Sequence, residues 1–144
     1  MPDADESKMK KGILSLVKTG NLIFLSGHGC EGEDGEPIVT GHVGKDVSVE
    51  DGIRAARKCG ERLLNTLEEY LGSLDRVRKI IKVLGFINSA QDFYEQPRVM
   101  NGFSELMVEQ LGERGRHARS AIGTSVLPAN QAVEIEMVVE VEEP

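Results

Sequence analysis

Residues 116–141 read RHARSAIGTSVLPANQAVEIEMVVEV, and this stretch predicts two β-strands. Along its second half, apolar residues alternate with glutamates almost without interruption. The alternating apolar residues are Val133, Ile135, Met137, Val139 and Val141. A period of two is typical of a strand that packs one face against a core. The first half alternates as well, and one of its faces carries small residues together with Arg119.

The two halves are joined by a segment rich in turn residues, 127–131, which contains Pro128 and Asn130. We therefore expect a hairpin that closes at this turn and places Arg119 on the sheet face of the glutamates. In such a hairpin Arg119 and Glu134 are separated by six residues along the strands, about 20 Å at roughly 3.3 Å per residue. They are then too far apart to hold one small ligand within a single chain. The sequence thus predicts an oligomer whose sites lie between subunits.

One long amphipathic stretch upstream predicts a helix. Apolar residues recur at spacings of three and four from Val49 to Leu71. Ser48 with Asp51 resembles a capping box at its start. Gly72 is the natural stop.

A second, shorter stretch also predicts a helix, with its body over residues 98–111. Asp92, followed three residues later by Glu95, is the expected cap. Pro97 is compatible only with the first turn of a helix, so the helix should start near it.

The remaining apolar segments predict strands at residues 13–17, 22–25, 38–43 and 77–87. With the two strands of the C-terminal stretch, the element order is β-β-β-α-β-α-β-β. Two helices on one face of a mixed sheet form the simplest two-layer arrangement, which makes the fold class α+β. The other sheet face then needs a cover, and a second subunit is the expected one.

The charge balance excludes some classes of function. Lys and Arg total 17 against 24 Asp and Glu, which gives a net charge of −7. This argues against a dedicated nucleic-acid binder, because phosphate neutralisation supplies most of the non-specific affinity.

The start of the chain lacks the apolar core of a signal peptide, and no apolar run approaches the ~20 residues that span a bilayer. We expect a soluble, cytoplasmic protein with no membrane partner, in which residues 1–11 form a flexible tail and residues 12–144 one domain.

Neither the cysteines nor the histidines predict a metal site. Cys30 and Cys59 fit no disulfide framework or zinc spacing, so reduced thiols are expected. The three histidines add no zinc-binding pattern. Residues 41–45 look superficially like a phosphate loop, but Asp46 stands where Ser or Thr would bind magnesium.

Several motifs together carry a resemblance to a known family. They include Gly20-Asn21-Leu22 running to Ser26-Gly27, Gly85-Phe86-Ile87 with Asp92-Phe93, and above all Ala118-Arg119-Ser120 followed by Leu127-Pro128 and Val133-Glu134-Ile135-Glu136. In these residues the chain resembles the Rid/YjgF family of reactive-intermediate (imine/enamine) deaminases, also known as endoribonuclease L-PSP or translation inhibitors. The resemblance implies a chorismate-mutase-like fold. It also implies a homotrimer with a central barrel of strands and three clefts between subunits.

The resemblance also assigns roles to residues. It places the carboxylate-binding arginine at Arg119, the acidic water-orienting residue at Glu134, and the Ser-Gly of the cleft wall at Ser26-Gly27. Arg119 and Glu134 are the predicted catalytic residues. The predicted substrate-binding residues are Arg119, Ser26, Gly27, His28, Asn101 and Pro128. No cofactor is required.

Three positions depart from the family pattern. The usual tyrosine falls on Ile13, and a cysteine common in the imine deaminases falls on Ala121. An asparagine of the second helix falls on Pro97, although Asn101, one turn later, can face the same way. These departures point to a different substrate or to a binder without turnover.

Each candidate also has a structural interpretation. Arg119 can form an interface salt bridge, for example to Glu140 opposite it in the predicted hairpin. The glutamates after Glu134 are best read as a solvated strand face. The first helix carries a basic stripe of Arg54, Arg57, Lys58 and Arg62. Without interleaved aromatic residues, and with glutamates on the same helix, this stripe also predicts a solvated face.

The function predicted from sequence is binding of a small carboxylate-bearing imine, enamine or 2-keto acid between subunits. If there is turnover, it hydrolyses the imine to a keto compound and ammonia, with Glu134 acting on the water. A non-catalytic metabolite-binding or regulatory trimer is the first alternative. An endoribonuclease or translation inhibitor is the second, and the net charge argues against it.

Overall fold

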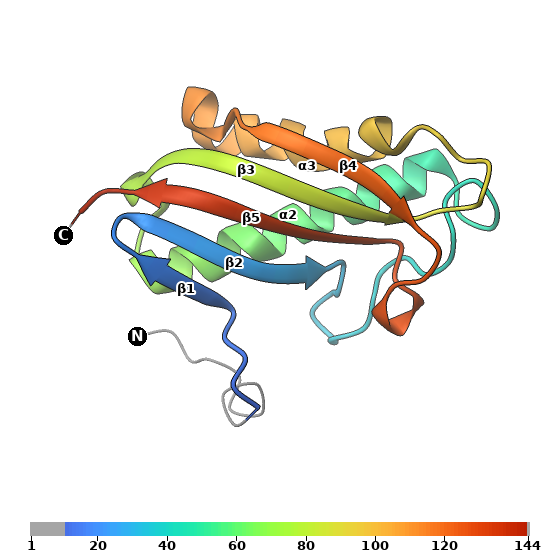
Figure 1. Cartoon of the computed structure of the whole chain (residues 1–144), viewed down its shortest axis with the longest axis horizontal. Helices are drawn as coiled ribbons and strands as arrows, with labels where there is room; N and C mark the ends of the chain where they lie inside the picture. Colours follow the sequence, from blue (N-terminus) through green and yellow to red (C-terminus); the bar gives the residue numbers. More distant parts are fainter. Residues whose placement is uncertain (1–10, 144) are drawn as a thin grey trace.

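A computed structural model describes residues 11–143 as a mixed sheet with two helices packed behind it (Figure 1). Most of the predicted N-terminal tail, residues 1–10, lies outside the described residues. The strands are β1 (Leu16–Thr19), β2 (Leu22–Gly29), β3 (Val77–Asn88), β4 (Ala118–Thr124) and β5 (Val133–Val141). The helices are α2 (Val49–Leu71) and α3 (Gln96–Leu111). The predicted α+β class, with both helices on one sheet face, is confirmed.

The strand order across the sheet is β1-β2-β5-β3-β4, and only β3 and β4 run parallel. The expected hairpin of β4 with β5 is therefore wrong, because β3 lies between them. Instead of turning tightly, the connection passes the end of β3 through a short 3-10 turn, Pro128–Asn130. In that turn Ala129 and Asn130 both have positive φ, 58° and 54°. The chain thus re-enters the sheet one strand further in, where β5 bonds to β2 and β3 on its two edges.

Helix α2 has the predicted bounds. The Ser48 hydroxyl accepts a hydrogen bond from the Asp51 N–H at 3.1 Å, which satisfies one of the free donors of the first turn. At the other end Gly72 adopts a left-handed conformation with φ of 86°, and its N–H donates to the Glu68 carbonyl. An L side chain would be strained at this φ, so glycine ends the helix here.

Helix α3 starts at Gln96 with Pro97 in its first turn, as predicted, but its expected cap is wrong. The N-cap residue is Glu95, and its side chain forms no capping hydrogen bond. Asp92 lies outside the helix, in the turn where the Phe93 N–H bonds to the Ala90 carbonyl. Phe93 itself is buried. The position of this segment therefore follows from the burial of Phe93 and not from helix capping by Asp92.

The third strand predicted at 38–43 does not form, so the observed order lacks one of the predicted strands. This segment makes only isolated bridges, such as Thr40 to Gln131. Gly41 and Gly44 have φ of 119° and 90°, conformations that interrupt an extended strand. Its backbone groups bond to other loops instead, including Gly41 N–H to the Asn130 carbonyl.

The core between sheet and helices is aliphatic, and the alternate apolar residues of β5 are buried in it as predicted. Gly102 of α3 lies directly against the backbone of α2. A Cβ at this position would stand 2.2 Å from the Ile53 carbonyl oxygen. Within residues 11–143 no helix is long and apolar enough to cross a membrane.

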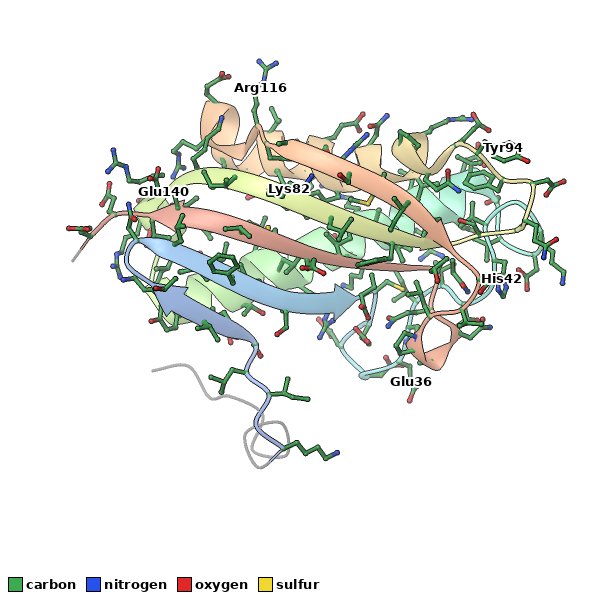
Figure 2. All side chains as sticks on the ribbon, viewed as in Figure 1. Glu36, His42, Lys82, Tyr94, Arg116 and Glu140 are labelled. Carbon is green, nitrogen blue, oxygen red and sulfur yellow. The ribbon has the colours of Figure 1, made fainter. Side chains whose placement is uncertain are left out.

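The sheet face turned toward the viewer in Figure 1 carries no helix. One row of paired residues crosses it from edge to edge: Val17, Phe24, Val138, Lys82 and Ala118. Lys82 marks this row in Figure 2. Val17 and Phe24 are 54% and 47% exposed, and Ile122 on the same face is 46% exposed. We call this surface the helix-free face.

Candidate functional site

Within the described chain, the predicted site residues fall into two separate groups. The first surrounds Glu134 and lines a hollow of about 280 Å³ between β2, β5 and α2. It brings together Ser26, Gly27, His28, Pro128 and Glu134, all predicted from sequence, with Ser15, Gly29, Glu31, Arg62, Thr66 and Gln131.

An irregularity in strand β2 brings its backbone close to Glu134. The pairing of β2 with β5 shifts register between Leu25 and His28, and Ser26 and Gly27 lie in this shift. A Cβ on Gly27 would stand 2.8 Å from Oε2 of Glu134. Glycine at position 27 therefore lets the Glu134 carboxylate lie directly against the strand.

Glu134 is half-buried, and its charge is disfavoured there. Burial raises the pKa of Glu134 above the ordinary carboxyl value, and the nearby Glu31 and Glu136 raise this pKa further. A carboxylate with a raised pKa is a stronger base toward a bound water. The group is therefore suited to general-base chemistry.

His28 is buried at the back of the same hollow. Its Nδ1 is 2.7 Å from the Ser26 carbonyl oxygen, and its Nε2 is 2.8 Å from the Thr66 hydroxyl oxygen. The ring thus connects the β2 irregularity to helix α2 and is held in one orientation.

Sequence reasoning missed six residues that line this hollow, and two of them, Arg62 and Gln131, have defined hydrogen-bonding roles. Arg62, assigned to a solvated stripe, instead donates Nη1 to the Gly29 carbonyl at 3.0 Å and to the Glu31 carboxylate. Gln131 is buried, and its side-chain oxygen accepts from the Cys30 N–H at 3.1 Å. Arg62 lies on α2 and Gln131 in the loop before β5, and both contact the end of β2 or the residue after it. The local sequence around each residue does not indicate these contacts.

The second group surrounds Arg119 at the β4 edge of the sheet. Nη1 of Arg119 donates to Asn101 Oδ1 at 3.0 Å and to Ser104 Oγ at 3.1 Å, and Nη2 donates to the Pro97 carbonyl at 3.2 Å. Asn101 thus faces the arginine from α3, and Pro97 contributes its backbone oxygen. Burial lowers the pKa of Arg119 from its ordinary value, although an arginine stays charged at neutral pH. The three bonds fix the plane of the guanidinium.

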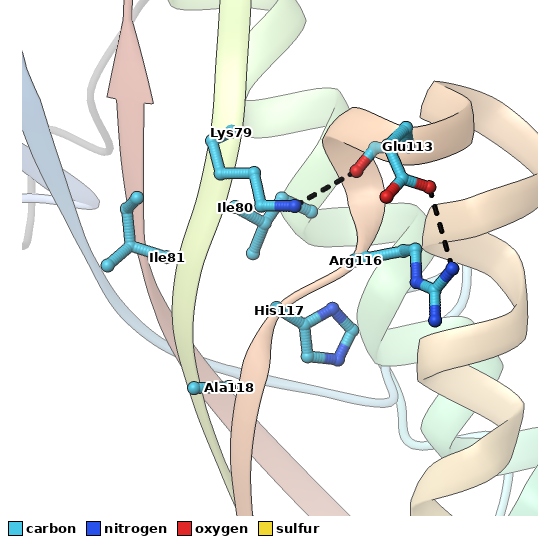
Figure 3. A pocket seen from close by; sticks show the side chains of 7 residues that line it. All are labelled: Lys79, Ile80, Ile81, Glu113, Arg116, His117 and Ala118. Carbon is cyan, nitrogen blue, oxygen red and sulfur yellow. Dashed lines mark hydrogen bonds and ion pairs between the residues drawn. The ribbon is translucent and has the colours of Figure 1, made fainter.

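Arg119 lines one hollow, and a second hollow shares Arg116 and His117 with it. The smaller, about 230 Å³, is lined by Ser104, Val108, Arg116, His117 and Arg119. The larger, about 500 Å³, lies on the other side of His117 and is shown in Figure 3. There Lys79 Nζ donates to the Glu113 carbonyl at 3.0 Å, and Arg116 lies 3.5 Å from the Glu113 carboxylate. This end of the sheet is consequently rich in cations.

Arg119 and Glu134 lie on opposite faces of the sheet, which corrects the expectation that Arg119 shares a face with the glutamates. Arg119 pairs with Val83, a core residue, and its side chain reaches α3. Glu134 pairs with Phe86, which pairs with Ile122 on the helix-free face. The alternative interpretation, a salt bridge from Arg119 to Glu140 opposite it in a hairpin, is also not met in the described chain, because β4 and β5 are not neighbours.

Arg119 and Glu134 are also separated along the strands. Ile122, level with Glu134, is three residues from Arg119, or about 10 Å along the strand, and β4 and β5 are two strand spacings apart, about 9.5 Å. One chain alone does not bring the two groups onto one small ligand.

Other chemistry finds little support in the described part of the chain. No group of three or more His, Cys, Asp or Glu residues there is placed to hold a metal ion. Cys30 and Cys59 are free and buried, and burial raises the pKa of the Cys59 thiol well above its ordinary value. Much of the basic stripe on α2 is paired with acids: Arg54 with Asp51, Arg57 with Glu109, Lys58 with Glu61.

This chain is similar to known proteins in sequence and in fold. Residues 15–141 match the family described as "YjgF/chorismate mutase-like, putative endoribonuclease". The chain is 38% identical over 128 residues to Protein TCP17 of Trypanosoma cruzi, covering 88% of this chain and 79% of that protein.

Two solved structures extend the comparison. Atu1372 from Agrobacterium tumefaciens, a protein with unknown function, superposes with a TM-score of 0.88 at 42% identity, covering 90% of this chain and 81% of that one. RidA from the Antarctic bacterium Psychrobacter sp. PAMC 21119 gives a TM-score of 0.60 at 26% identity, covering 89% and 87%.

Proposed function

This chain belongs to the YjgF/Rid family, and we propose that it binds a small carboxylate-bearing metabolite in clefts between the subunits of a homotrimer. The proposed ligands are imines, enamines and 2-keto acids. The proposed reaction is hydrolysis of an imine to the keto compound and ammonia.

The separation of Arg119 from Glu134 is the observation that carries this proposal. Arg119 and Glu134 lie on opposite faces of one sheet, and each lines a hollow of its own that opens at the surface. Arg119 lies on the edge strand β4, where a neighbouring chain can approach. A second subunit that presents its Glu134 hollow to this edge would complete a site with a cation at one end and a base at the other.

The chemistry follows from the two groups. Arg119, held planar by Asn101, Ser104 and Pro97, can bind a ligand carboxylate through a two-pronged contact. Glu134 of the neighbouring subunit can take a proton from a water as the water oxygen bonds to the imine carbon. The C=N electron pair moves to the nitrogen, which takes that proton from Glu134, and a carbinolamine results. Glu134 then moves the hydroxyl proton to the nitrogen, the C–N bond breaks, and ammonia leaves the keto compound. The Ser26-Gly27 backbone forms the wall beside the reacting carbon.

A binder without turnover is the second candidate, and Ile13 favours it. This residue stands where the family has a tyrosine, and it is exposed rather than part of the core. An isoleucine supplies no hydroxyl to a ligand or a water. Such a protein would retain the Arg119 contact and lack the hydrolysis.

Cleavage of RNA, suggested by the family description, has less support. The chain carries a net charge of −7, and most cations of the α2 stripe are paired with carboxylates. An RNA-binding surface needs unpaired cations to neutralise phosphates.

Subunit mixing tests the proposal directly. Arg119→Ala and Glu134→Gln each remove one half of the site, so each variant alone should lose imine hydrolysis, measured as ammonia release. After subunit exchange, some interfaces combine an intact Arg119 with an intact Glu134. We expect part of the activity to return in this mixture.

The matched control mixes Arg119→Ala with the double variant Arg119→Ala/Glu134→Gln, because no interface in that mixture contains both residues. Exchange is verified by mass spectrometry of intact oligomers. Activity that stays absent in the first mixture, or returns equally in both, would rule out a shared site. If the unmutated protein binds 2-keto acids in an Arg119-dependent way but releases no ammonia, the non-catalytic candidate is correct.

A further inference from the structure

Ser104, His117 and Gly115 form a chain of hydrogen bonds beside Arg119. Ser104 Oγ is 2.9 Å from Nε2 of His117, and Nδ1 of His117 is 2.7 Å from the Gly115 carbonyl oxygen. Nη1 of Arg119 donates to the same Ser104 Oγ at 3.1 Å. In the imine chemistry proposed above, Ser104 serves only to hold Arg119, and His117 has no role.

The direction of each bond follows from the chemistry of its partners. A carbonyl oxygen can only accept, so His117 donates through Nδ1–H to Gly115. In the neutral imidazole Nε2 then carries a lone pair, and the Ser104 hydroxyl donates its proton to it. The Ser104 oxygen accepts from Arg119 with one lone pair and keeps the second for a new bond. A nucleophile, a base and a group that orients the base are thereby in contact.

The surroundings of His117 keep the ring neutral and fixed. Burial lowers the pKa of His117 below the ordinary histidine value, and the positive charges of Arg119 and Lys79 lower this pKa too, against the opposing bond to Gly115. The Phe103 ring packs edge-on against the imidazole, with centroids 5.6 Å apart and an interplanar angle of 72°. A neutral imidazole can accept a proton, as a general base must.

Ser104 is half-buried and lines two hollows that open at the surface. Ser104 lines the hollow of about 230 Å³ that contains Arg119, and a second hollow of about 490 Å³ with Glu105, Val108 and Glu109. His117 lies between the smaller of these and the hollow of Figure 3. A small acyl group can therefore approach the oxygen from outside the protein.

We propose that Ser104 is a nucleophile for acyl transfer, with His117 as its general base and Arg119 as the cation that stabilises the oxyanion. The substrates are carboxylic esters or thioesters with a small acyl group. A guanidinium has five N–H groups. Arg119 uses three of them on residues of the described chain, which leaves two for a developing negative charge.

The reaction balances with water as the second substrate. Ser104 Oγ bonds to the acyl carbon while its proton moves to Nε2 of His117, and the carbonyl electron pair moves onto oxygen beside Arg119. The oxyanion collapses, the bond to the leaving alcohol or thiol breaks, and His117 returns the proton to that group. A water then attacks the acyl-serine with His117 again as base. The products are a carboxylic acid and free Ser104.

The same hydrogen bonds have a purely structural interpretation, in which Ser104 and His117 only hold Arg119 in place. That interpretation predicts no covalent intermediate. The proposal shares Arg119 with the imine chemistry but needs neither Glu134 nor a second subunit, so a failure of one can be distinguished from a failure of the other.

The test uses the full chain with p-nitrophenyl acetate. We expect release of p-nitrophenolate together with an acetyl group on the peptide that contains Ser104, identified by mass spectrometry. Ser104→Ala should abolish both. His117→Gln should slow the acylation by about 10²- to 10⁴-fold, the usual contribution of a general base.

Ser125→Ala, which alters an exposed serine outside both site groups, is the matched control and should acylate like the unmutated protein. An acetyl group found elsewhere, or equal rates in Ser104→Ala and Ser125→Ala, would overturn the proposal. Should Ser104→Ala fail to fold, the position of the acetyl group on the unmutated protein decides alone.

The pH dependence gives a second readout. The base must be neutral, and its lowered pKa means that acylation should persist below pH 6.5, the ordinary histidine value, and decline only at lower pH. His117→Gln should lack this decline. A rate that instead falls at or above pH 6.5 contradicts His117 as the base.

Discussion

Glu134 and Gly27 show how one side chain and the absence of another create a reactive group. The carboxylate lies against a backbone that only glycine leaves open, and its charge is poorly solvated there. A group with a raised pKa favours its protonated form in the folded state. Glu134 therefore costs stability once the pH rises above the ordinary carboxyl value of 4.5, and the full cost is present above the raised value.

Replacing this carboxylate should consequently stabilise the protein. Glu134→Gln keeps the shape and removes the charge, so its melting temperature should exceed that of the unmutated protein at pH 7. The difference should shrink as the pH is lowered toward 4.5. Thermal unfolding at several pH values, at one protein concentration, measures this. Glu33→Gln, at an exposed loop position, is the control. An equal gain in melting temperature in both variants would show that the burial of the Glu134 charge is not the cause.

At this scale the sequence identified many residues of the two groups but not their arrangement. Ser26, Gly27, His28, Pro128 and Glu134 could be predicted together, because a family pattern marks them. Arg62 and Gln131 could not, since Arg62 acquires its role from a contact with Gly29 at the end of β2, and Gln131 from one with Cys30, the next residue. Such contacts join residues that are 33 and 101 positions apart in the chain.

At the scale of elements, the two helices pack unusually closely at Gly102. In an exposed helix position, replacing glycine with alanine stabilises by about 0.5–1 kcal/mol. Here the added Cβ would meet the Ile53 carbonyl oxygen at 2.2 Å, and a backbone atom cannot move aside without shifting α2. Gly102→Ala should therefore destabilise the protein, by about 1–3 kcal/mol, the range for overpacking.

Denaturant unfolding at a fixed protein concentration checks the sign of this change. The matched control is Gln110→Ala, at an exposed position of the same helix, which should stay within about 0.5 kcal/mol of the unmutated protein. A stabilised Gly102→Ala would show that the helices separate at little cost.

The helices were predictable from sequence, whereas the strand neighbours were not. Periodicity and caps are local, and Ser48 and Gly72 end α2 at the expected residues. The alternation in β4 and β5 correctly separated the two faces of each strand. It carried no information on which strand lies beside which, so the assumed hairpin placed Arg119 on the wrong face of the sheet. The β3 strand, 30 residues or more away in sequence, enters between them.

On the scale of the whole molecule, the helix-free face would link assembly to the site in the proposed trimer. Its central row runs across all five strands of the described chain and includes the exposed Val17 and Phe24. The same face carries Glu134. In the proposed trimer, a subunit that covers this row would also bring its own edge strand toward a neighbour's Glu134 hollow, so assembly and ligand binding should be lost together.

A carboxylate in place of Phe24, between Val17 and Val138 in that row, should separate the subunits without unfolding them. Phe24→Asp places a carboxylate where the proposed trimer buries an aromatic ring. The ring is already exposed in the single chain, so the fold of each subunit should survive. Light scattering should give about three times 15.8 kDa for the unmutated protein and a single 15.8 kDa for the variant, with unchanged circular dichroism. Binding of 2-keto acids should disappear, although Phe24 lies in neither site group.

Tyr94→Asp is the control, because Tyr94 is an 80% exposed aromatic residue in the loop before α3, away from the helix-free face (Figure 2). It should remain trimeric and bind normally. A Phe24→Asp protein that stays trimeric would show that another surface holds the subunits together, and a monomeric variant that still binds the keto acid would show that one chain forms the whole site.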